Sequence, residues 1–357
     1  MKAEYTTKIL SNRMNREKLE DVLPLDAPFG LEVGLSGVCN LKCKFCFQNN
    51  PAISKKYAQL GMMDEVTFHK AVDDALDFPQ KLKNFKIVGI GEELANPQAT
   101  DYIEYACKKD VADLVEITTN GTLLTYDMID RLTVSGLDRI NISIEALTDD
   151  GYYEICSKKI DVGEMVNKIS YMYQRKEKAQ SNLTIYVKIA DVSLKDETDK
   201  DLFFEMFGDI CDEIYIENII PAWAANDDTS TNWIRSRKKG KTGIGEFGQE
   251  AHYKKACPFP FTKMYIFPNG DVSFCNVFST IGLAHFNINE RSLIDIWNSK
   301  EFFEFFVAQL TFNRESYSCC ANCNMNKYIA IDDIDGYAET ILERVIERGK
   351  KYGHIIG

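Results

Sequence analysis

The sequence has no apolar run close to the ~20 residues that a membrane-spanning helix requires. Its first residues, MKAEYTTKIL, lack the basic-then-apolar order of a secretory signal. It also lacks an excess of positive charge, since 42 Lys and Arg stand against 54 Asp and Glu, for a net charge of −12. Such a chain is poorly suited to binding duplex DNA or an anionic membrane by charge. We therefore expect a cytoplasmic protein with neither nucleic acid nor membrane as a partner.

The composition also excludes a disordered or fibrous protein. Of the 357 residues, 45% are hydrophobic and 27% are charged, and neither an internal repeat nor a low-complexity segment is present. This length provides one large or two modest globular domains with sizeable cores.

Short apolar runs alternate with amphipathic stretches through the first two thirds of the chain. The predicted strands are 31–35, 84–89, 114–119, 139–144, 183–189 and 213–219. The predicted helices are 66–76, 99–108, 126–134, 162–175 and 200–207. This alternation, without hairpins, indicates a parallel sheet of βαβ units. Six units are fewer than the eight of a closed barrel, so we predict an α/β fold with an open, partial (β/α)6 TIM-like barrel.

The rest of the chain differs in character from the barrel segment. The predicted organisation is a lead-in segment at 1–30, the barrel at 31–222, a polar linker or lid at 223–256, a small second domain at 257–325 and a C-terminal helix at 326–357. In the second domain, Asn269-Gly270 predicts the turn of a β-hairpin between 263–267 and 272–275. Helices are predicted at 292–309 and 337–351.

Eleven cysteines are present, and three of them form a group: Cys39, Cys43 and Cys46. Clustered cysteines in a reducing compartment indicate metal ligands or reactive thiols. The group directly follows the first predicted strand, and active sites lie at that end of barrel strands. A structural zinc would take four ligands, whereas three cysteines on a [4Fe–4S] cluster leave one iron open. The spacing favours an open catalytic cluster, with zinc or incidental cysteines as alternatives.

The CxxxCxxC motif, with Phe45 before its last cysteine, resembles that of the radical S-adenosylmethionine (SAM) superfamily. The resemblance implies that the three cysteines hold a [4Fe–4S] cluster whose open iron binds SAM. It further implies reductive cleavage of SAM to a 5′-deoxyadenosyl radical, which takes a hydrogen atom from the substrate. Phe45 matches the aromatic residue that packs near the adenine, and a flavodoxin or ferredoxin is the expected reductant.

Further positions at successive strand ends resemble the family's SAM-binding elements. The segment with Gly91, Glu92 and Glu93 is similar to the GGEP element, although Glu93 stands where proline is usual. The resemblance assigns SAM contacts to a wider set: Gly91, Glu92, Glu93, Thr119, Asn120, Ser143, Glu145, Lys188 and Ile219.

A second group consists of Cys257, Cys275, Cys320 and Cys323. A hairpin with a cysteine near each end, followed by a distant CxxC, can close a four-cysteine site, which zinc would also accept. The pattern resembles the SPASM domain of radical SAM proteins in its shortened twitch form. That resemblance implies one auxiliary [4Fe–4S] cluster, fully ligated by cysteine, that carries electrons.

Two other cysteines could donate a hydrogen atom to a substrate radical. Cys319 adjoins a predicted ligand, and Cys156 follows the fourth strand; otherwise both are bystanders. A basic run at 235–241 could clamp the phosphate of a phosphorylated or nucleotide-linked substrate, because Arg and Lys suit phosphate, or it is a solvated surface loop.

The expected function is oxidation or epimerisation of a carbohydrate-like small molecule, such as a sugar, nucleotide sugar or aminocyclitol. The twitch domain resembles that of an aminocyclitol dehydrogenase. A peptide modifier is the alternative, although we expect no leader-binding domain within the first 30 residues or so. A non-catalytic zinc or iron–sulfur module is the third possibility, and it would leave the three-cysteine site unexplained.

Overall fold

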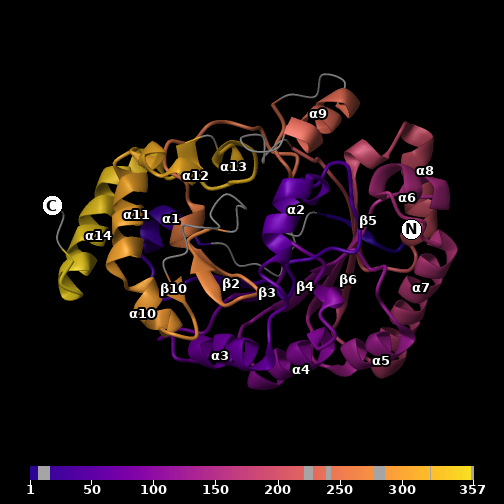
Figure 1. Cartoon of the computed structure of the whole chain (residues 1–357), viewed down its shortest axis with the longest axis horizontal. Coiled ribbons are helices and arrows are strands. Elements are labelled where there is room, and N and C mark those ends of the chain that lie inside the picture. The colour runs from indigo at the N-terminus through magenta and orange to yellow at the C-terminus, as the bar shows by residue number, and fades with distance from the viewer. Residues whose placement is uncertain (7–16, 221–227, 239–242, 276–285, 322, 355–357) are drawn as a thin grey trace.

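The structure is a computed structural model that describes residues 1–357 except 7–16, 221–227, 239–242, 276–285, 322 and 355–357. Its strands lie on the inside of a curved layer, and α3, α4, α5, α7 and α8 cover the outside (Figure 1). The strands among the described residues form one open sheet in the order β1-β7-β6-β5-β4-β3-β2-β8-β9-β10. The predicted α/β fold with a partial barrel is confirmed.

Six parallel strands make up the barrel, and each lies within two residues of its predicted bounds. They are β2 (Gly30–Val33), β3 (Asn84–Ile87), β4 (Val115–Thr119), β5 (Arg139–Ile144), β6 (Thr184–Ala190) and β7 (Glu213–Glu217). Neighbours in the chain are neighbours in the sheet, and all these pairs are parallel. The carboxyl ends of the strands therefore share one edge, where the predicted site residues lie.

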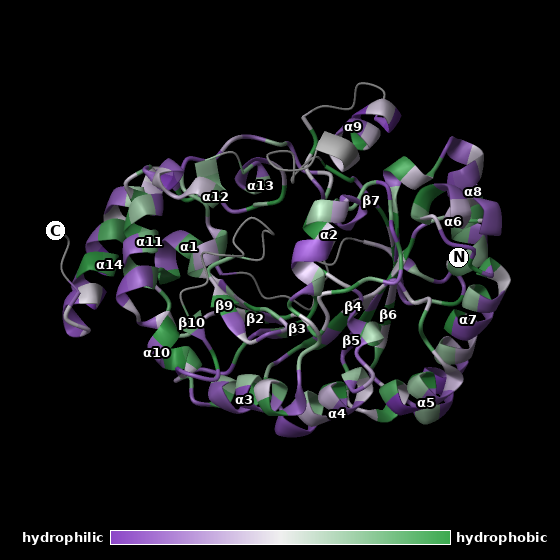
Figure 2. Cartoon of the chain, viewed as in Figure 1, coloured by the Kyte–Doolittle hydropathy of each residue, from purple (hydrophilic) through white to green (hydrophobic). Residues whose placement is uncertain are grey.

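The helices between these strands follow the predicted order. They are α3 (Glu65–Leu76), α4 (Ala99–Lys109), α5 (Tyr126–Val134), α7 (Val162–Ala179) and α8 (Glu197–Phe207). Four of them begin after a side-chain cap that accepts backbone N–H bonds, at Asp64, Thr125, Asp161 and Asp196. Figure 2 shows their hydrophobic faces turned towards the sheet and their hydrophilic faces turned outward, as expected for amphipathic helices on a core.

Among the described residues, three helices of eight residues or more lie where the sequence predicted none. They are α2 (Pro51–Ala58), α6 (Asp149–Cys156) and α9 (Asp228–Arg237). Both α2 and α6 follow strand ends and border the cysteine loop. The segment predicted as a polar linker or lid thus includes the helix α9.

The N-terminal segment joins the barrel at its far edge. β1 (Glu4–Tyr5) pairs in parallel with β7, and the short α1 (Leu19–Val22) buries Leu19 in the main core. A two-residue strand is too short to show periodicity, so the sequence did not predict it.

The C-terminal region extends the same sheet from its other edge. β8 (Lys263–Ile266) pairs in parallel with β2, and β9 (Asp271–Ser273) and β10 (Phe286–Asn287) follow in antiparallel order. The predicted hairpin is confirmed, and its Gly270 has a φ of +84° that favours glycine. The C-terminal helices are α10 (Leu293–Trp297), α11 (Lys300–Leu310), α12 (Ser318–Ala321), α13 (Met325–Tyr328) and α14 (Ala338–Lys351).

The predicted helix at 292–309 is two helices, because Ser299 ends one and caps the next. The Ser299 hydroxyl accepts the N–H of Phe302 at 3.3 Å, which starts α11. The predicted helix at 337–351 is confirmed as α14.

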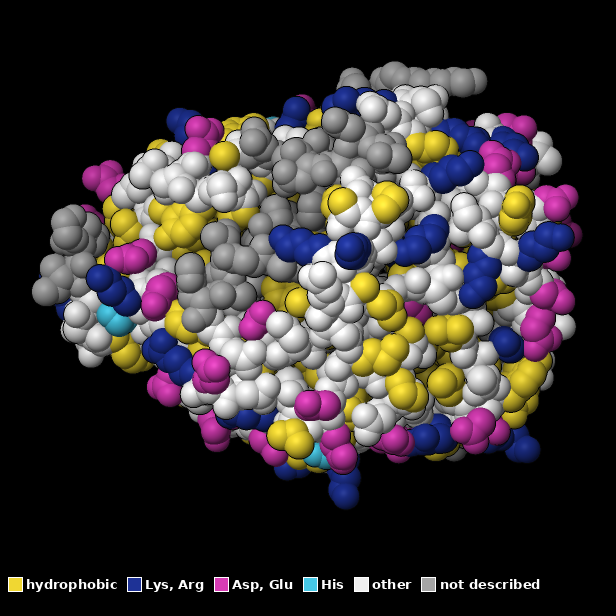
Figure 3. All heavy atoms as spheres, viewed as in Figure 1, with side chains coloured by type: hydrophobic (Ala, Val, Ile, Leu, Met, Phe, Trp, Pro, Cys, Tyr) yellow, Lys and Arg dark blue, Asp and Glu magenta, His cyan; other side chains and the backbone are white. Residues whose placement is uncertain are grey.

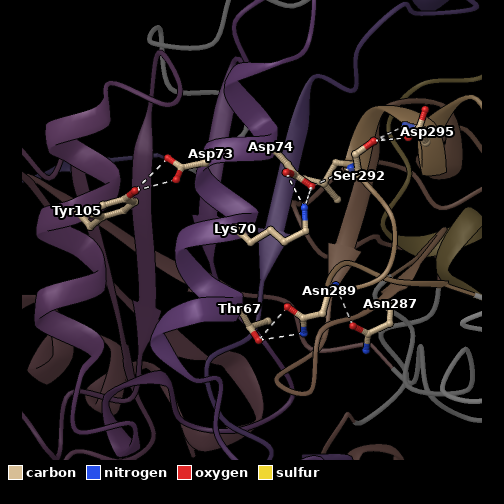
Figure 4. A network of polar contacts seen from close by, with 10 residues as sticks. Thr67, Lys70, Asp73, Asp74, Tyr105, Asn287, Asn289, Ser292 and Asp295 are labelled. Atoms are coloured by element: carbon tan, nitrogen blue, oxygen red, sulfur yellow. Dashed lines mark hydrogen bonds and ion pairs between the residues drawn. The ribbon is translucent and has the colours of Figure 1, made fainter.

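Polar contacts fasten the C-terminal region to α3 (Figure 4). The Asn289 amide donates to the hydroxyl of Thr67 at 3.1 Å, and the N–H of Leu293 donates to Asp74 at 3.1 Å. Lys70 forms an ion pair with the same Asp74 at 2.8 Å. Together with the β2–β8 pairing, these contacts hold the second cysteine group beside the barrel. No helix in the described part of the chain is long and apolar enough to span a membrane.

Candidate active site

The first cysteine loop leaves β2 and is supported by α6. The backbone N–H groups of Lys42 and Lys44 donate to the carbonyls of Cys156 and Ile155, at 3.1 and 2.9 Å. Cys43 is buried, whereas Cys39 and Cys46 are half-buried. The loop is therefore fixed by the helix that sequence analysis missed.

Two N–H groups point at the sulfur of Cys39. The backbone N–H of Leu41 lies 3.5 Å from Cys39 Sγ, and Asn120 Nδ2 lies 4.0 Å away. Burial raises the pKa of Cys39 to about 11. Without a bound metal, Cys39 therefore favours the protonated thiol over the thiolate, and a bound cationic centre would reverse this preference.

Cys156 lies against the same loop. Its Sγ is 3.4 Å from that of Cys43, and this contact, followed by burial, raises the pKa of Cys43. The candidate hydrogen donor thus touches a predicted cluster ligand.

Glu92 organises the loops after β3 and β4. Its carboxylate accepts the hydroxyl of Thr119 at 2.5 Å and the backbone N–H of Asn120 at 2.8 Å. The Asn120 amide in turn donates to Asn40 at 2.9 Å. Glu92, Thr119 and Asn120 are thereby linked directly to the cysteine loop.

Gly91 and Glu93 bring the loop after β3 against the loop after β2. A Cβ on Gly91 would lie 2.4 Å from the carbonyl oxygens of Ser36 and Val38, so only glycine fits there. The Glu93 side chain points back to β2 and accepts the N–H of Leu35 at 2.5 Å. Burial raises the pKa of Glu93 to about 8. At this position, where the family has proline, Glu93 stabilises the turn through its hydrogen bond with Leu35.

Glu145 and Lys188 form a charged group at the ends of β5 and β6. Ser143 pairs in register with Lys188, and Lys188 donates to the carboxylate of Glu217 at 2.6 Å. Burial raises the pKa of Glu145 to about 8, whereas nearby Lys188 lowers it. Ser143, Glu145 and Lys188 are thus brought together, and Glu217 is an addition that the sequence analysis missed.

Phe45 and Ile219 meet in one apolar patch. Both pack on the buried cluster of Ala190, Val192 and Ile234, together with Trp233 of α9. The ring centroids of Phe45 and Trp233 are 6.0 Å apart. Sequence analysis missed Trp233; its signal was a tryptophan followed by Ile234 in a largely polar segment.

The second group brings Cys257, Cys320 and Cys323 together near β8 and α12. Cys257 is buried, and its burial, together with the nearby Cys323 and Cys320, raises its pKa to about 12. Cys319 Sγ lies 3.7 Å from that of Cys320, so this second candidate hydrogen donor is also beside a predicted ligand. Cys275 packs on an apolar cluster that also contacts Cys323 and Cys46.

Two buried donors at the second group have no acceptor. Arg314 Nε and Gln309 Nε2 are both buried and lack hydrogen-bond partners. Gln309 accepts the N–H of Cys257 at 3.2 Å, and Arg314 donates to the carbonyls of Cys320 and Cys323 at 2.8 and 2.9 Å. Unsatisfied buried donors beside thiols suit an anionic, sulfur-rich group, so these residues fit an iron–sulfur cluster.

The donors of the first group fit such a cluster too. The first group offers three predicted thiol ligands in one loop, and N–H groups are aimed at one of their sulfurs. This environment is typical of iron–sulfur clusters. In the described part of the chain, no three His, Cys, Asp or Glu side chains converge as ligands of a single metal ion.

A cavity of about 500 Å³ is lined by residues of the barrel strands and by neighbours in sequence of two predicted ligands, although no cysteine of either group lines it. On one side it is lined by Phe47, which follows Cys46, and by Lys188. On the other side it is lined by Pro258, which follows Cys257, and by Met325 of α13.

The basic run lies at the end of α9 and is partly neutralised. Arg237 pairs with Glu154 at 2.7 Å, and Lys238 pairs with Asp191 at 3.4 Å. Lys239 and Lys241 lie outside the described residues. A row of Lys and Arg side chains also crosses the face that carries α2 (Figure 3).

Comparison with protein families identifies two domains. The Radical SAM superfamily matches residues 33–202, and the SPASM iron–sulfur cluster-binding domain matches residues 257–324. The first match includes the first cysteine group, and the second match includes the second cysteine group.

Characterised relatives are distant. The chain is 24% identical over 341 residues to the tungsten-containing aldehyde ferredoxin oxidoreductase cofactor-modifying protein of Pyrococcus furiosus, over 85% of this chain and 90% of that protein. It is 29% identical over 182 residues to a GTP 3′,8-cyclase of Clostridium perfringens, and this match spans about half of each chain, 51% in both cases.

Solved structures share the fold at low identity. BtrN in complex with AdoMet and 2-DOIA matches with a TM-score of 0.52 and 17% identity, over 86% of this chain and 96% of that one. Streptococcus suis SuiB bound to SAM matches with a TM-score of 0.56 and 16% identity, over 89% and 76%. anSMEcpe with bound AdoMet matches with a TM-score of 0.54 and 14% identity, over 90% and 97%.

The cofactors follow from the domains. A radical SAM domain uses SAM and a [4Fe–4S] cluster, and a SPASM domain adds auxiliary iron–sulfur ligation. The chain belongs to the radical SAM superfamily and carries a C-terminal SPASM domain.

Proposed function

We propose that this protein dehydrogenates a C–OH group of a carbohydrate-like small molecule, such as a sugar, nucleotide sugar or aminocyclitol, with epimerisation as the redox-neutral variant. The observation that carries the proposal is the cavity lined by Phe47 and Pro258, the residues that directly follow Cys46 and Cys257. A substrate held there would lie between the site of hydrogen abstraction and an electron acceptor.

The cavity lining combines apolar walls with charged side chains that could bind a hydroxylated substrate. Its walls carry charged side chains in pairs, Lys86 with Glu116 at 3.6 Å and Lys263 with Glu32 at 2.8 Å. Paired charges offer both donors and acceptors to hydroxyl and amino groups without a large net charge. The cavity volume of about 500 Å³ lies within the range of small-molecule sites.

The first cysteine group, Cys39, Cys43 and Cys46, would hold the SAM-binding cluster. When bound, this cluster and SAM supply the radical that accepts a hydrogen atom, and the auxiliary cluster supplies the electron acceptor. Lys188 and Glu145 would bind the charged amino-acid end of SAM.

The protein's own contribution is positioning and exclusion of water. Phe45, Ile219 and Trp233 form the apolar patch suited to the adenine. Glu92 holds the loops after β3 and β4 through Thr119 and Asn120. Cys257, Cys275, Cys320 and Cys323 would hold the auxiliary cluster.

Peptide modification is the second candidate function. SuiB bound to the precursor peptide SuiA shares this fold with a TM-score of 0.53 at 15% identity. Against it stand the paired charges in the cavity, which could bind the hydroxyl or amino groups of a small polar substrate.

A phosphorylated or nucleotide-linked substrate is a variant of the first candidate. GTP 3′,8-cyclases are among the relatives, and their name places a nucleotide among the substrates of this superfamily. Of the described members of the basic run, Arg237 and Lys238 already have acidic partners, so they would contribute to a phosphate site only after exchanging those partners, whereas Arg235 is exposed.

The test is 5′-deoxyadenosine release by the anaerobically reconstituted enzyme with SAM and dithionite in D₂O. The panel contains sugars, nucleotide sugars, aminocyclitols and peptides. Stimulation by a sugar or cyclitol, with a product two mass units lighter, supports the dehydrogenase. An isomeric product with one deuterium indicates the epimerase, and stimulation by peptides alone contradicts the proposal.

A further inference from the structure

The second cysteine group is accompanied by a buried cation that has no carboxylate partner. Arg314 is only 3% exposed, and among the described residues it forms no ion pair with a carboxylate. Removing a guanidinium from water is costly unless another charge or several hydrogen bonds compensate. The nearest compensation is two backbone carbonyls, those of Cys320 and Cys323.

The position of Arg314 is fixed by these bonds and by an aromatic ring. Its Nη2 donates to both carbonyls at 2.8 and 2.9 Å, and its guanidinium lies 5.5 Å from the ring centre of Tyr253. Its Nε is buried and has no partner. The charge is therefore held next to two predicted ligands, with one N–H left to donate.

Gln309 supplies a second free donor from α11. Its Oε1 accepts the N–H of Cys257 at 3.2 Å, which orients the amide, while its Nε2 is buried without a hydrogen-bond partner. The same side chain lies beside the thiol of Cys320. Arg314 also lies close to that thiol. Both donors therefore favour negative charge on sulfur.

A cluster ligated by four thiolates carries net negative charge, and reduction makes it more negative by one. A nearby fixed cation stabilises the reduced form more than the oxidised form, and N–H donation to cluster or cysteine sulfur acts in the same direction. The protein sets reduction potentials through such outer-shell contacts.

We propose that Arg314 and Gln309 are positioning residues of the auxiliary cluster that raise its reduction potential. This inference rests on the auxiliary ligand set of the proposed function. A higher potential would make the cluster a better acceptor for an electron from the substrate, so the inference also bears on the choice between dehydrogenase and epimerase.

The experiment isolates the auxiliary cluster by replacing Cys39, Cys43 and Cys46 with alanine in the full-length chain. Iron and sulfide content and an EPR-monitored redox titration are then measured with Arg314→Gln, Arg314→Lys and Gln309→Leu. Arg131→Gln is the matched control, because Arg131 lies on α5 and pairs with Glu104 and Asp101 far from either cysteine group.

The expected result is a lower midpoint potential for Arg314→Gln at unchanged iron content. Arg314→Lys should keep most of the wild-type potential because it keeps the charge. Gln309→Leu should lower the potential by less, since it removes only a neutral donor. Arg131→Gln should leave the potential unchanged.

An unchanged potential in Arg314→Gln at full iron content would overturn the proposal, because a merely structural clamp alters cluster retention and not potential. If Arg314→Gln loses its iron, the midpoint potentials of Arg314→Lys and Gln309→Leu test the proposal instead. Wild-type potential in Gln309→Leu would then count against the proposal. A three-alanine parent without iron would refute the auxiliary ligand set itself, which is a failure of the proposed function.

Discussion

At the scale of single residues, the three thiols of the first loop carry the chemistry. Replacing Cys39 with alanine should remove the SAM-binding cluster and leave the auxiliary one. We expect the iron content to fall by about half and 5′-deoxyadenosine formation to fall to background, since each cluster binds about four irons. Colorimetric iron analysis and chromatography measure both quantities.

Cys107→Ala is the control for this prediction. Cys107 lies on α4, away from both groups, so the variant should keep wild-type iron and activity. Full iron content in Cys39→Ala would contradict the assignment of the first ligand set.

Glu93 gives a pH dependence of stability whose sign follows from its pKa. The folded pKa is about 8, against an ordinary value of 4.5, because of burial. The folded state therefore binds the Glu93 proton more tightly than the unfolded state does. The stabilisation of the folded state that results from this difference declines as the pH rises from about 4.5 to about 8. One pKa unit corresponds to about 1.4 kcal/mol. Glu93→Gln should therefore stabilise the apoprotein by at least about 1 kcal/mol more at pH 8 than at pH 5.

Denaturant unfolding of the apoprotein at both pH values measures this difference. Glu290→Gln, at an exposed position, is the matched control. Its effect on the unfolding free energy should be the same at pH 5 and at pH 8. An equal effect of Glu93→Gln at the two pH values would show that Glu93 ionises freely in the folded state.

The sequence predicts residues that belong to short motifs and misses those that only folding brings together. The cysteines are recognisable because ligand type and spacing lie within one loop. Arg314, Gln309 and Trp233 belong to no motif, and their roles depend on packing between segments far apart in the chain. Glu93 was assigned to SAM by its place in a motif, whereas its side chain points to β2.

At the scale of elements, α9 is one of three helices around the candidate site, with α2 and α6, that the sequence did not predict. Its exposed residues are mostly polar, so hydrophobic periodicity is weak, and only Trp233 and Ile234 face the apolar patch with Phe45. The barrel strands, in contrast, are buried apolar runs bounded by polar segments, and their bounds were predicted closely.

Trp233→Ala should weaken SAM binding by roughly tenfold, because aromatic contacts contribute on the order of 1 kcal/mol or more at such patches. Equilibrium dialysis of SAM with the reconstituted enzyme measures the Kd. Tyr126→Ala, which removes an exposed aromatic side chain on α5, should leave it unchanged. Wild-type affinity in Trp233→Ala would show that α9 does not contribute to the SAM site.

At the scale of the whole molecule, the C-terminal region and the barrel form one sheet. The sequence could predict the hairpin from its Asn-Gly turn, but not its pairing with β2, because that contact joins segments more than 200 residues apart. The ion pair between Lys263 and Glu32 crosses this junction.

Lys263→Met should destabilise the apoprotein by about 3 kcal/mol, since it removes an ion-pair partner from the largely buried Glu32. The double variant Lys263→Met with Glu32→Leu should recover much of this loss. Calorimetry should show one unfolding transition for all three proteins. Two separate unfolding transitions, of which only the one at lower temperature shifts in the variants, would mean that the barrel and the C-terminal region unfold independently.

The charged surface bears on the choice of reductant, which we propose to be a flavodoxin or ferredoxin. Lys55 and Lys56 on α2 are exposed, and Lys42 joins this helix to the cysteine loop through Ser54 at 2.7 Å. Lys55→Glu with Lys56→Glu should slow turnover with an acidic flavodoxin severalfold at low salt, because it reverses local charge.

Turnover of the same variant with dithionite should be unchanged, which separates docking from chemistry. Lys350→Glu with Lys351→Glu, at the end of α14, is the matched control of equal charge. Equal slowing by both pairs would show that net charge matters and that this face does not.

The most direct test of the account follows deuterium from the substrate. The active substrate from the panel is labelled with deuterium at each C–H carbon in turn and incubated anaerobically with enzyme, SAM and reductant. The account predicts deuterium in 5′-deoxyadenosine from one labelled carbinol position, together with a ketone product. Deuterium-free 5′-deoxyadenosine from every labelled substrate would contradict it, because the bound molecule would not be the source of the abstracted hydrogen.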